Sequence, residues 1–533
     1  MKNSKFYAQC FLALLSGILL PFAFAPYEYS FLAVISSFLF FLSLQKKSPK
    51  AGFFIGLLYG IGCFGTGASW IYISIHTYGN TNVFLGMMIT LSFVLYLALY
   101  PSLVGYILQK CSPDFNPPSP SPARSFFATN IFRITETSSL TRALIVFPVL
   151  SVIMEWFRSF VITGFPWLLL GYSQINSPLA GYIPLIGVYG SSFLVLFIAG
   201  TLYVFIKHCK NKFAAISIPL SLFLLYLTGH YLSFIHWTTP VSSSPLKISL
   251  IQANVPISMK WSEQYALKAL SDYIFLSKQS ISDASKDTQT LIVWPETAVT
   301  FFLDESMPLL TSIDKFAIDH NTAIITGIPI RENNLFYNGA VVLGKGNGIY
   351  LKRHLVPFGE YTPFQEKLGR LLNFLNLPMS DFSDGPEKQH LLKIFNIKAA
   401  ALICYEVTYS DLWRSDLPDA NLLVGLSNDS WFGKSIASAQ QRQIAQFAAL
   451  ASGREMVVAT NSGETVVINS HGKIAASLPI NKTAVLESKI IPLKGATPWV
   501  RVGDTCIIVI LIFLLSLTQI KNFHLKNRLF QRK

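Results

Sequence analysis

The sequence predicts an integral membrane protein with about eight transmembrane helices and one α/β domain outside the bilayer. Of its 533 residues, 51% are hydrophobic and 13% are charged, whereas soluble proteins usually carry about 25% charged residues. Long apolar runs fill the first 238 residues and recur near the C-terminus, while residues 240–500 have a mixed composition. A chain of this length also exceeds one ordinary core. These observations together indicate a group of membrane spans and a separate folded domain.

Eight apolar runs approach the length of about 20 residues that the core of a bilayer requires. The first run follows Lys2 and Lys5 and ends in an A-x-A pattern, as a signal peptide does. Because Pro26 follows directly and further apolar runs come after it, we expect this run to be retained as a span. The expected spans are residues 8–25, 31–45, 51–73, 83–108, 143–161, 186–206, 213–235 and 503–520.

The basic residues between these runs predict how the chain crosses the membrane. Lys and Arg follow the second, fourth, sixth and eighth runs, whereas the short loops after the first and third runs carry none. Because cytoplasmic loops are enriched in Lys and Arg, we expect both termini in the cytoplasm and residues 240–500 on the outer side. Residues 1–238 then hold seven spans and a Pro- and Ser-rich cytoplasmic loop at 111–141, and residues 521–533 form a basic cytoplasmic tail. This topology explains the net charge of +14, so nucleic-acid binding is not expected.

Residues 240–500 read as an α/β domain. Short β-type runs such as "TLIVWPE" and "AAALICYE" alternate with helical stretches such as 262–280 and 436–453. Strands with few polar residues are typical of a sheet that is buried on both faces.

Cys404 is the cysteine of this outer domain, and it follows an apolar run directly. The topology places the other five of the six cysteines in spans or on the cytoplasmic side. A thiol without a disulfide partner is either inert core or a nucleophile, and residue type alone does not choose between them. A nucleophilic thiol needs a base and a positive group for the oxyanion. Glu296 and Lys352, each near the end of an apolar run, supply both; a purely structural Glu296–Lys352 ion pair is the alternative.

Seven motifs of the chain stand out together: "WPE" (294–296), "LKRHLVPFGEY" (351–361), "CYE" (404–406), "SNDSWFG" (427–433), "ASGREMVVATNSG" (451–463), "GFPWLLLGYSQ" (164–174) and "LIQANVPISMKW" (250–261). Those of the outer domain resemble the nitrilase superfamily, whose triad is glutamate, lysine and cysteine. The membrane spans on both sides of such a domain make the chain similar to the apolipoprotein N-acyltransferase family, a membrane-embedded branch. This resemblance implies an α-β-β-α sandwich, no cofactor, and a bacterial inner-membrane protein whose catalytic domain is periplasmic.

The resemblance also implies a two-step acyl transfer. Glu296 takes the thiol proton, Cys404 attacks the ester carbonyl of a phospholipid acyl chain, and Lys352 with backbone N–H groups holds the oxyanion. The α-amine of a diacylglyceryl-cysteine at the N-terminus of an apolipoprotein then attacks the thioester. Two other functions stay open: a membrane-anchored amidase that acts on a small amide, and a lipid transporter or lipid-binding protein with an inactive nitrilase domain.

The remaining candidates are residues around this triad. Among those carried over from the family, Glu360 is expected to orient Lys352, and Tyr405 and Glu406 to lie beside Cys404. A solvent-facing strand end is the alternative for Glu406. His354 is a candidate base or only a neighbour of the site, and no H-E-x-x-H or clustered Cys/His spacing suggests a metal. Four further residues have a packing or hydrogen-bonding alternative: Trp261 and Trp167 as acyl-chain or mouth contacts, and Asn338 and Arg454 near the site.

Overall fold

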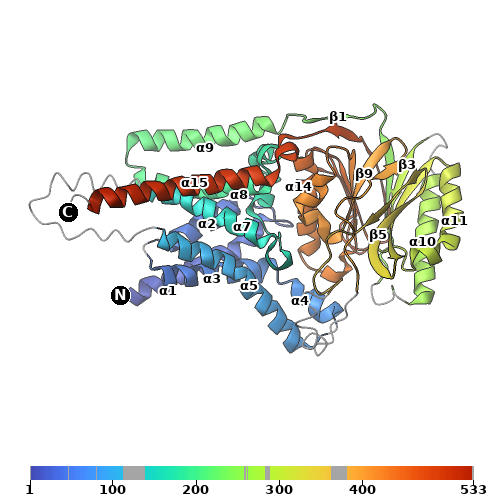
Figure 1. Cartoon of the computed structure of the whole chain (residues 1–533), viewed down its shortest axis with the longest axis horizontal. Helices are drawn as coiled ribbons and strands as arrows, with labels where there is room; N and C mark the ends of the chain where they lie inside the picture. The colour runs from blue at the N-terminus through green and yellow to red at the C-terminus, as the bar shows by residue number, and fades with distance from the viewer. Residues whose placement is uncertain are drawn as a thin grey trace, which may run out of the picture. The chain divides into compact units, whose positions relative to one another are not determined.

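The computed structural model divides the chain into two compact units (Figure 1). Unit 1 comprises Met1–Ser69, Met87–Phe234 and Val502–Lys533, and unit 2 comprises Trp70–Gly86 and Ile235–Arg501. Trp261 and most of the expected loop 111–141 lie outside the described residues. The structure describes residues 2–45, 47–79, 81–111, 139–256, 260, 262–282, 288–361 and 381–530, and the side chains of those between 4 and 518.

Unit 1 is built from apolar helices, and the expected class of integral membrane protein is confirmed. Six helical segments in the described residues are long and apolar enough to cross a membrane. They are Ser4–Ala23, Val83–Lys110, Ser139–Arg158, Pro178–His208, Lys212–Leu232 and Pro498–Thr518. These segments overlap, in order, with α1 (Lys2–Leu19), α5 (Val83–Lys110), α7 (Phe147–Arg158), α8 (Ile183–His208), α9 (Lys212–Leu232) and α15 (Pro498–Phe530).

Two of the eight expected runs form helices of another kind. α2 (Phe31–Ser43) has 13 residues and is therefore about 20 Å long, shorter than the hydrocarbon core of about 30 Å. α3 (Pro49–Gly67) and the segment Ile71–Tyr78 pass as a span only if the two are counted together, because the chain bends by 59° between them. Hydropathy alone does not register such a break, which explains why residues 51–73 read as one continuous run.

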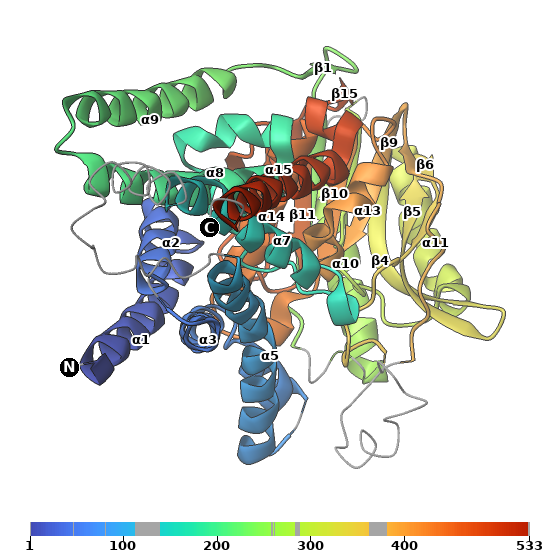
Figure 2. The same cartoon turned by 60° about the vertical axis from the view of Figure 1, so that its left-hand side comes forward.

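Glycines let the first helices of unit 1 approach one another closely. A Cβ atom on Gly17 of α1 would lie 2.1 Å from the carbonyl oxygen of Tyr59 in α3, and one on Gly52 of α3 would lie 2.4 Å from that of Gly105 in α5. Small residues at helix contacts are typical of membrane proteins, where close packing replaces the hydrophobic effect. In Figures 1 and 2, α9 lies at the outside of unit 1, and 6% of the residues in its apolar stretch are buried.

Unit 2 contains two large β-sheets. The six-stranded sheet has the order β14-β2-β3-β4-β5-β7, and β2, β3 and β4 are parallel. Its strands are β14 (Ala484–Ile490), β2 (Leu246–Gln252), β3 (Thr290–Val293), β4 (Thr322–Glu332), β5 (Leu335–Gly344) and β7 (Ile349–Leu351). The seven-stranded sheet has the order β13-β12-β11-β10-β9-β8-β6, and β9, β10 and β11 are parallel. Its strands are β13 (Ile474–Ser477), β12 (Val466–Ile468), β11 (Met456–Thr460), β10 (Leu422–Ser427), β9 (Ile397–Ile403), β8 (Leu392–Ile394) and β6 (Gly346–Asn347).

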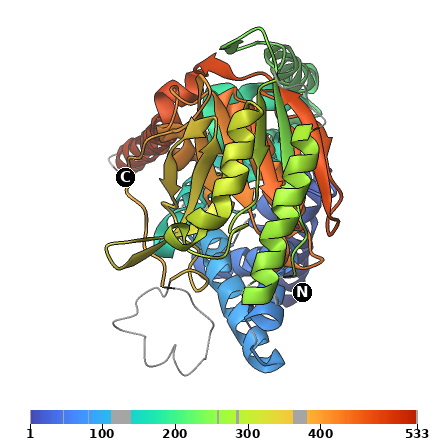
Figure 3. The same ribbon diagram turned by 90° about the vertical axis from the view of Figure 1, so that its right-hand side faces the viewer.

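The two sheets pack face to face between layers of helices, as the expected α-β-β-α sandwich requires. Between the sheets, Leu250, Val293 and Ile325 of one meet Ile403 and Leu426 of the other in a buried apolar cluster. The outer face of the six-stranded sheet is covered by α10 (Glu263–Ser282) and α11 (Leu303–Asp319), as Figure 3 shows. The outer face of the seven-stranded sheet is covered by α14 (Ala437–Ser452), as Figure 1 shows.

Candidate active site

Three strand ends of unit 2 carry the predicted triad. Glu296 follows β3, Lys352 follows β7 directly, and Cys404 follows β9 directly. Lys352 is 1% exposed, and its Nζ lies 3.4 Å from Oε1 of Glu296 and 2.9 Å from Oε1 of Glu360. Because the two sheets face one another, strands of different sheets deliver these groups to one place.

The two carboxylates are fixed by further hydrogen bonds. Asn338 Nδ2 donates to Oε1 of Glu296 and to Oε1 of Glu360, both at 2.8 Å. The backbone N–H of Asn428 donates to Oε2 of Glu296 at 2.9 Å, and that of Val356 to Oε2 of Glu360 at 2.8 Å. Glu360 and Asn338, both named from the sequence, are thus in direct contact with the Glu296–Lys352 pair.

The electrostatics favour a charged lysine and a neutral thiol in the resting site. Burial alone would lower the pKa of Lys352, but the adjacent carboxylates of Glu360 and Glu296 outweigh burial and raise it. Burial raises the pKa of the Cys404 thiol, Glu296 raises it further, and the charge of Lys352 opposes that rise. A thiol that is neutral at rest must lose its proton during attack, which is the task of a general base such as Glu296.

Cys404 occupies a tight turn with a strained backbone. Its φ is +55°, a left-handed conformation that is uncommon for residues other than glycine. It opens the 3-10 turn Cys404–Thr408, and its carbonyl oxygen accepts a hydrogen bond of 3.2 Å from Nε2 of Gln441 on α14. The side chain is partly exposed. Such strain is found at functional sites when the surroundings hold it in place.

Glu406 holds this turn against the segment that carries Lys352. Its side chain is 0% exposed, so it is not a solvent-facing strand end. It accepts hydrogen bonds from the hydroxyl of Tyr350 at 2.9 Å and from the backbone N–H groups of Arg353 at 2.6 Å, His354 at 3.2 Å and Ile403 at 2.7 Å. Four donors from two chain segments therefore converge on one carboxylate.

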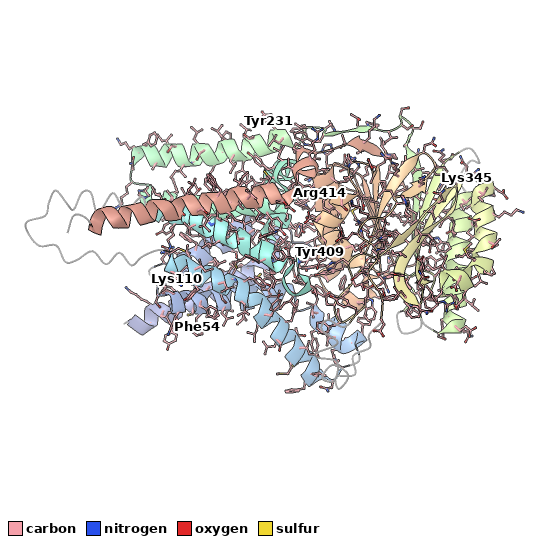
Figure 4. All side chains as sticks on the ribbon, viewed as in Figure 1. Phe54, Lys110, Tyr231, Lys345, Tyr409 and Arg414 are labelled. Atoms are coloured by element: carbon pink, nitrogen blue, oxygen red, sulfur yellow. The ribbon has the colours of Figure 1, made fainter. Side chains whose placement is uncertain are left out.

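The aromatic neighbours of the turn are His354, Tyr405 and Tyr409. The His354 ring centroid lies 3.7 Å from that of Tyr409, which is labelled in Figure 4, and the Tyr405 ring lies 5.2 Å from Tyr409. Burial, reinforced by the charge of Lys352, lowers the pKa of His354 to about 4. The imidazole is therefore neutral near pH 7 and packs as a ring beside the site.

Two other sequence candidates lie elsewhere. Arg454 is fully buried and donates to the carbonyl oxygens of Ala420 at 2.6 Å and Gly495 at 2.6 Å. Ala420 precedes β10, at the opposite end of the parallel strands from Cys404, so the structure does not bring Arg454 to the triad. Trp167 belongs to unit 1, where its side chain is 1% exposed and its carbonyl oxygen accepts a hydrogen bond from Arg158.

Sequence reasoning missed two charged residues near Glu296. Lys260 is buried and its Nζ donates to the carbonyl oxygen of Glu296 at 3.2 Å; burial lowers its pKa to about 8. A lysine in a loop carries no sequence signal of burial. Asp429 is buried two residues after β10, and a carboxylate behind an apolar strand was the signal that singled out Glu296. Within the described residues, no three His, Cys, Asp or Glu side chains form a group that could hold a metal ion.

Comparisons with known proteins cover both units. A family model described as apolipoprotein N-acyltransferase N-terminal domain matches residues 16–201, and one described as carbon-nitrogen hydrolase matches residues 247–496. An apolipoprotein N-acyltransferase of Coxiella burnetii is 39% identical over 511 residues, which cover 95% of this chain and 99% of that protein. One of Pseudomonas aeruginosa is 38% identical over 92% of this chain and 91% of its own length, and one of Methylococcus capsulatus is 35% identical over 92% of each.

Proposed function

The chain belongs to the apolipoprotein N-acyltransferase family, and on this premise we propose that Cys404 carries an acyl chain from a phospholipid to the N-terminal amine of a lipoprotein. The chain is an N-acyltransferase of the inner membrane with a carbon-nitrogen hydrolase domain. The observation that supports the proposed mechanism is the position of Lys352 between Glu296 and Glu360, near the turn that carries Cys404.

The first half-reaction loads the cysteine. Glu296 accepts the thiol proton while Sγ of Cys404 attacks the ester carbonyl of the donor, and the carbonyl oxygen becomes an oxyanion. The Lys352 ammonium has three hydrogens, and in the part of the chain that the structure describes two are directed at Glu296 and Glu360. The third is available to the oxyanion. When the carbon–oxygen bond breaks, the departing alkoxide takes the proton from Glu296 and lysophospholipid leaves.

The second half-reaction unloads the cysteine. The α-amine of a diacylglyceryl-cysteine attacks the thioester carbonyl, and Glu296 accepts a proton from the attacking nitrogen. The carbon–sulfur bond breaks, an amide forms, and the thiolate regains its proton from Glu296. A thioester must survive between the two steps, so a site with little water favours transfer over hydrolysis.

The proposed topology puts the catalytic domain, residues 240–500, in the periplasm. Residues 1–238 hold the membrane helices that precede this domain, residues 503–520 hold the last span, and both termini are cytoplasmic. The support is the distribution of Lys and Arg in the loops, which are rich in these residues only after every second run.

Product analysis tests the proposed function directly. The purified protein is incubated in detergent with phosphatidylethanolamine and a synthetic peptide that begins with diacylglyceryl-cysteine. We expect equal amounts of lysophospholipid and N-acylated peptide. Release of free fatty acid with an unmodified peptide would instead identify a hydrolase, and turnover of small amides alone would identify an amidase.

A further inference from the structure

Asp429 is a buried carboxyl group that the proposed reaction does not use. It is 6% exposed, and it accepts hydrogen bonds from the hydroxyl of Ser427 at 2.5 Å and from the hydroxyl of Ser438. Burial raises its pKa to about 6, the two hydroxyls oppose that rise, and the negative charges of Glu296 and Glu464 add to it. Glu464 itself is paired with Arg442 of α14 at 2.6 Å.

Asp429 is connected to the backbone of the nucleophile through two side chains. Nε2 of Gln441 donates to Oγ of Ser427 and to the carbonyl oxygen of Cys404, both at 3.2 Å. Oγ of Ser427 also lies within hydrogen-bond reach of the Cys404 thiol, whose pKa burial raises and the charge of Asp429 raises further. In the resting site the thiol is neutral and can itself donate, whereas the carboxylate only accepts, so the single hydrogen of Ser427 points to Asp429. Oγ of Ser427 then accepts from Gln441, and the second hydrogen on Nε2 reaches Cys404. The charge on Asp429 therefore sets which group donates and which accepts in each hydrogen bond between Asp429 and the carbonyl oxygen of Cys404.

The hydrogen bond from Gln441 to Cys404, the last in this series, fixes one peptide bond of the site. The Cys404–Tyr405 peptide is trans, so its carbonyl and its N–H point in opposite directions. Holding the carbonyl of Cys404 towards α14 directs the N–H of Tyr405 to the opposite side of the peptide. We propose that Asp429 is a positioning residue that acts through Ser427 and Gln441 to hold the Cys404–Tyr405 peptide, and with it the nucleophile, in one orientation for acylation. The inference rests on the proposed acylation of Cys404.

Protonation of Asp429 would release this arrangement. A protonated carboxyl group can donate to Ser427, whose hydrogen can then turn to Gln441. The amide must present Oε1 instead of Nε2 to accept it, and Oε1 cannot bond the carbonyl oxygen of Cys404. These side chains line a cavity of about 20 Å³. The carboxylate form is present above the pKa of about 6, so acylation slows as the pH falls through that value.

Ser438 provides a variant that separates positioning from folding. Its hydroxyl bonds Asp429 but not Gln441 or Cys404, and its loss removes an interaction that lowers the pKa of Asp429. Ser438→Ala should therefore acylate at pH 8 within about threefold of the native rate, with the acid limb of its pH profile moved to higher pH. Asp429→Asn should be slower by roughly ten- to hundredfold at pH 8, the scale for loss of one buried hydrogen bond, with the KM for phospholipid unchanged.

The experiment measures the rate of acyl-adduct formation on Cys404 by intact-mass spectrometry, with phosphatidylethanolamine in detergent, between pH 5 and pH 8. Thermal unfolding of each variant in the same detergent confirms that it is folded. If the native protein is acylated normally and the acid limb of the pH profile is the same in Ser438→Ala, the proposed role of Asp429 is overturned. Native protein that forms no adduct at any pH would instead overturn the proposed function on which this inference depends.

Discussion

Among the residues of the site, Lys352 has the contacts that define its role most closely. A buried ammonium between two carboxylates is stabilised as a cation, and its raised pKa keeps it charged across the physiological range. A purely structural pair would need one carboxylate, whereas two are present, and both are fixed by Asn338. The excess of negative charge suits a site in which Glu296 exchanges a proton while Glu360 keeps the lysine in place.

Replacing Lys352 tests whether the charge serves catalysis. Lys352→Met should reduce the rate of acyl transfer by about 10²–10³-fold, the usual scale for loss of one oxyanion donor. The matched control is Lys345→Met, because Lys345 (labelled in Figure 4) follows the end of β5, whereas Leu351, next to Lys352, pairs with Gly339 nearer the start of that strand. Turnover is measured as lysophospholipid released per minute. A folded Lys352→Met protein with near-native turnover would reduce the cluster to a structural ion pair.

At the scale of elements, the site depends on how strand ends are tied together. Glu296, Lys352 and Cys404 could be found from the sequence because each stands at or near the end of an apolar run, where a polar group needs a partner. The position of Glu406 could not, because its partners Tyr350 and Arg353 lie more than 50 residues earlier in the chain and reach it only once β7 and β9 are in place.

The break after α3 shows a second limit of sequence reasoning. Hydropathy reads residues 51–73 as one span, yet the segment Trp70–Gly86 belongs to unit 2. There Ser74 donates to the carbonyl oxygen of Trp431 at 2.9 Å, and the ring of Trp70 lies 4.9 Å from that of Phe432. Aromatic residues are as apolar in a domain core as in a bilayer, so composition does not distinguish the two settings.

The Glu406 contacts predict a stability effect. Glu406→Gln replaces one acceptor oxygen by an NH2 group that faces N–H donors, which leaves at least one buried donor without a partner. We expect the free energy of unfolding to fall by about 1–3 kcal/mol. Acyl transfer should be lost as well, because the segments that carry Lys352 and Cys404 separate. Thermal denaturation in detergent measures the first effect. Tyr350→Phe, which removes one donor and leaves three, should cost less; equal stability of Glu406→Gln and native protein would contradict this account.

At the scale of the whole molecule, the topology decides which substrates the catalytic domain can meet. The proposed phospholipid donor and lipoprotein acceptor are both membrane-bound, so under the proposed topology a domain attached between two spans would meet them at the bilayer surface. The fold class follows from composition, since a bilayer imposes length and polarity directly. The number of spans does not, because the described residues contain six helices that are long and apolar enough to cross, where eight runs were expected. The side of the membrane rests on the charged loops alone.

A series of reporter fusions tests on which side of the membrane residues 240–500 lie. Alkaline phosphatase, which folds only in an oxidising compartment, is joined after a residue near 300 and, as the control, within the loop 111–141. We expect activity from the first fusion and none from the second. Activity in the opposite pattern would place residues 240–500 in the cytoplasm and remove the proposed acceptor from their reach.

The covalent intermediate on Cys404 is the central claim, and intact-mass spectrometry tests it most directly. The protein is given phosphatidylethanolamine without an acceptor, treated with neutral hydroxylamine, and weighed before and after. We predict a mass gain of one acyl chain that maps to Cys404, is removed by hydroxylamine as a thioester is, and is absent in Cys404→Ala. If Cys404→Ala still transferred acyl chains to a lipoprotein amine at an appreciable rate, the transfer would be direct and Cys404 would serve only in packing.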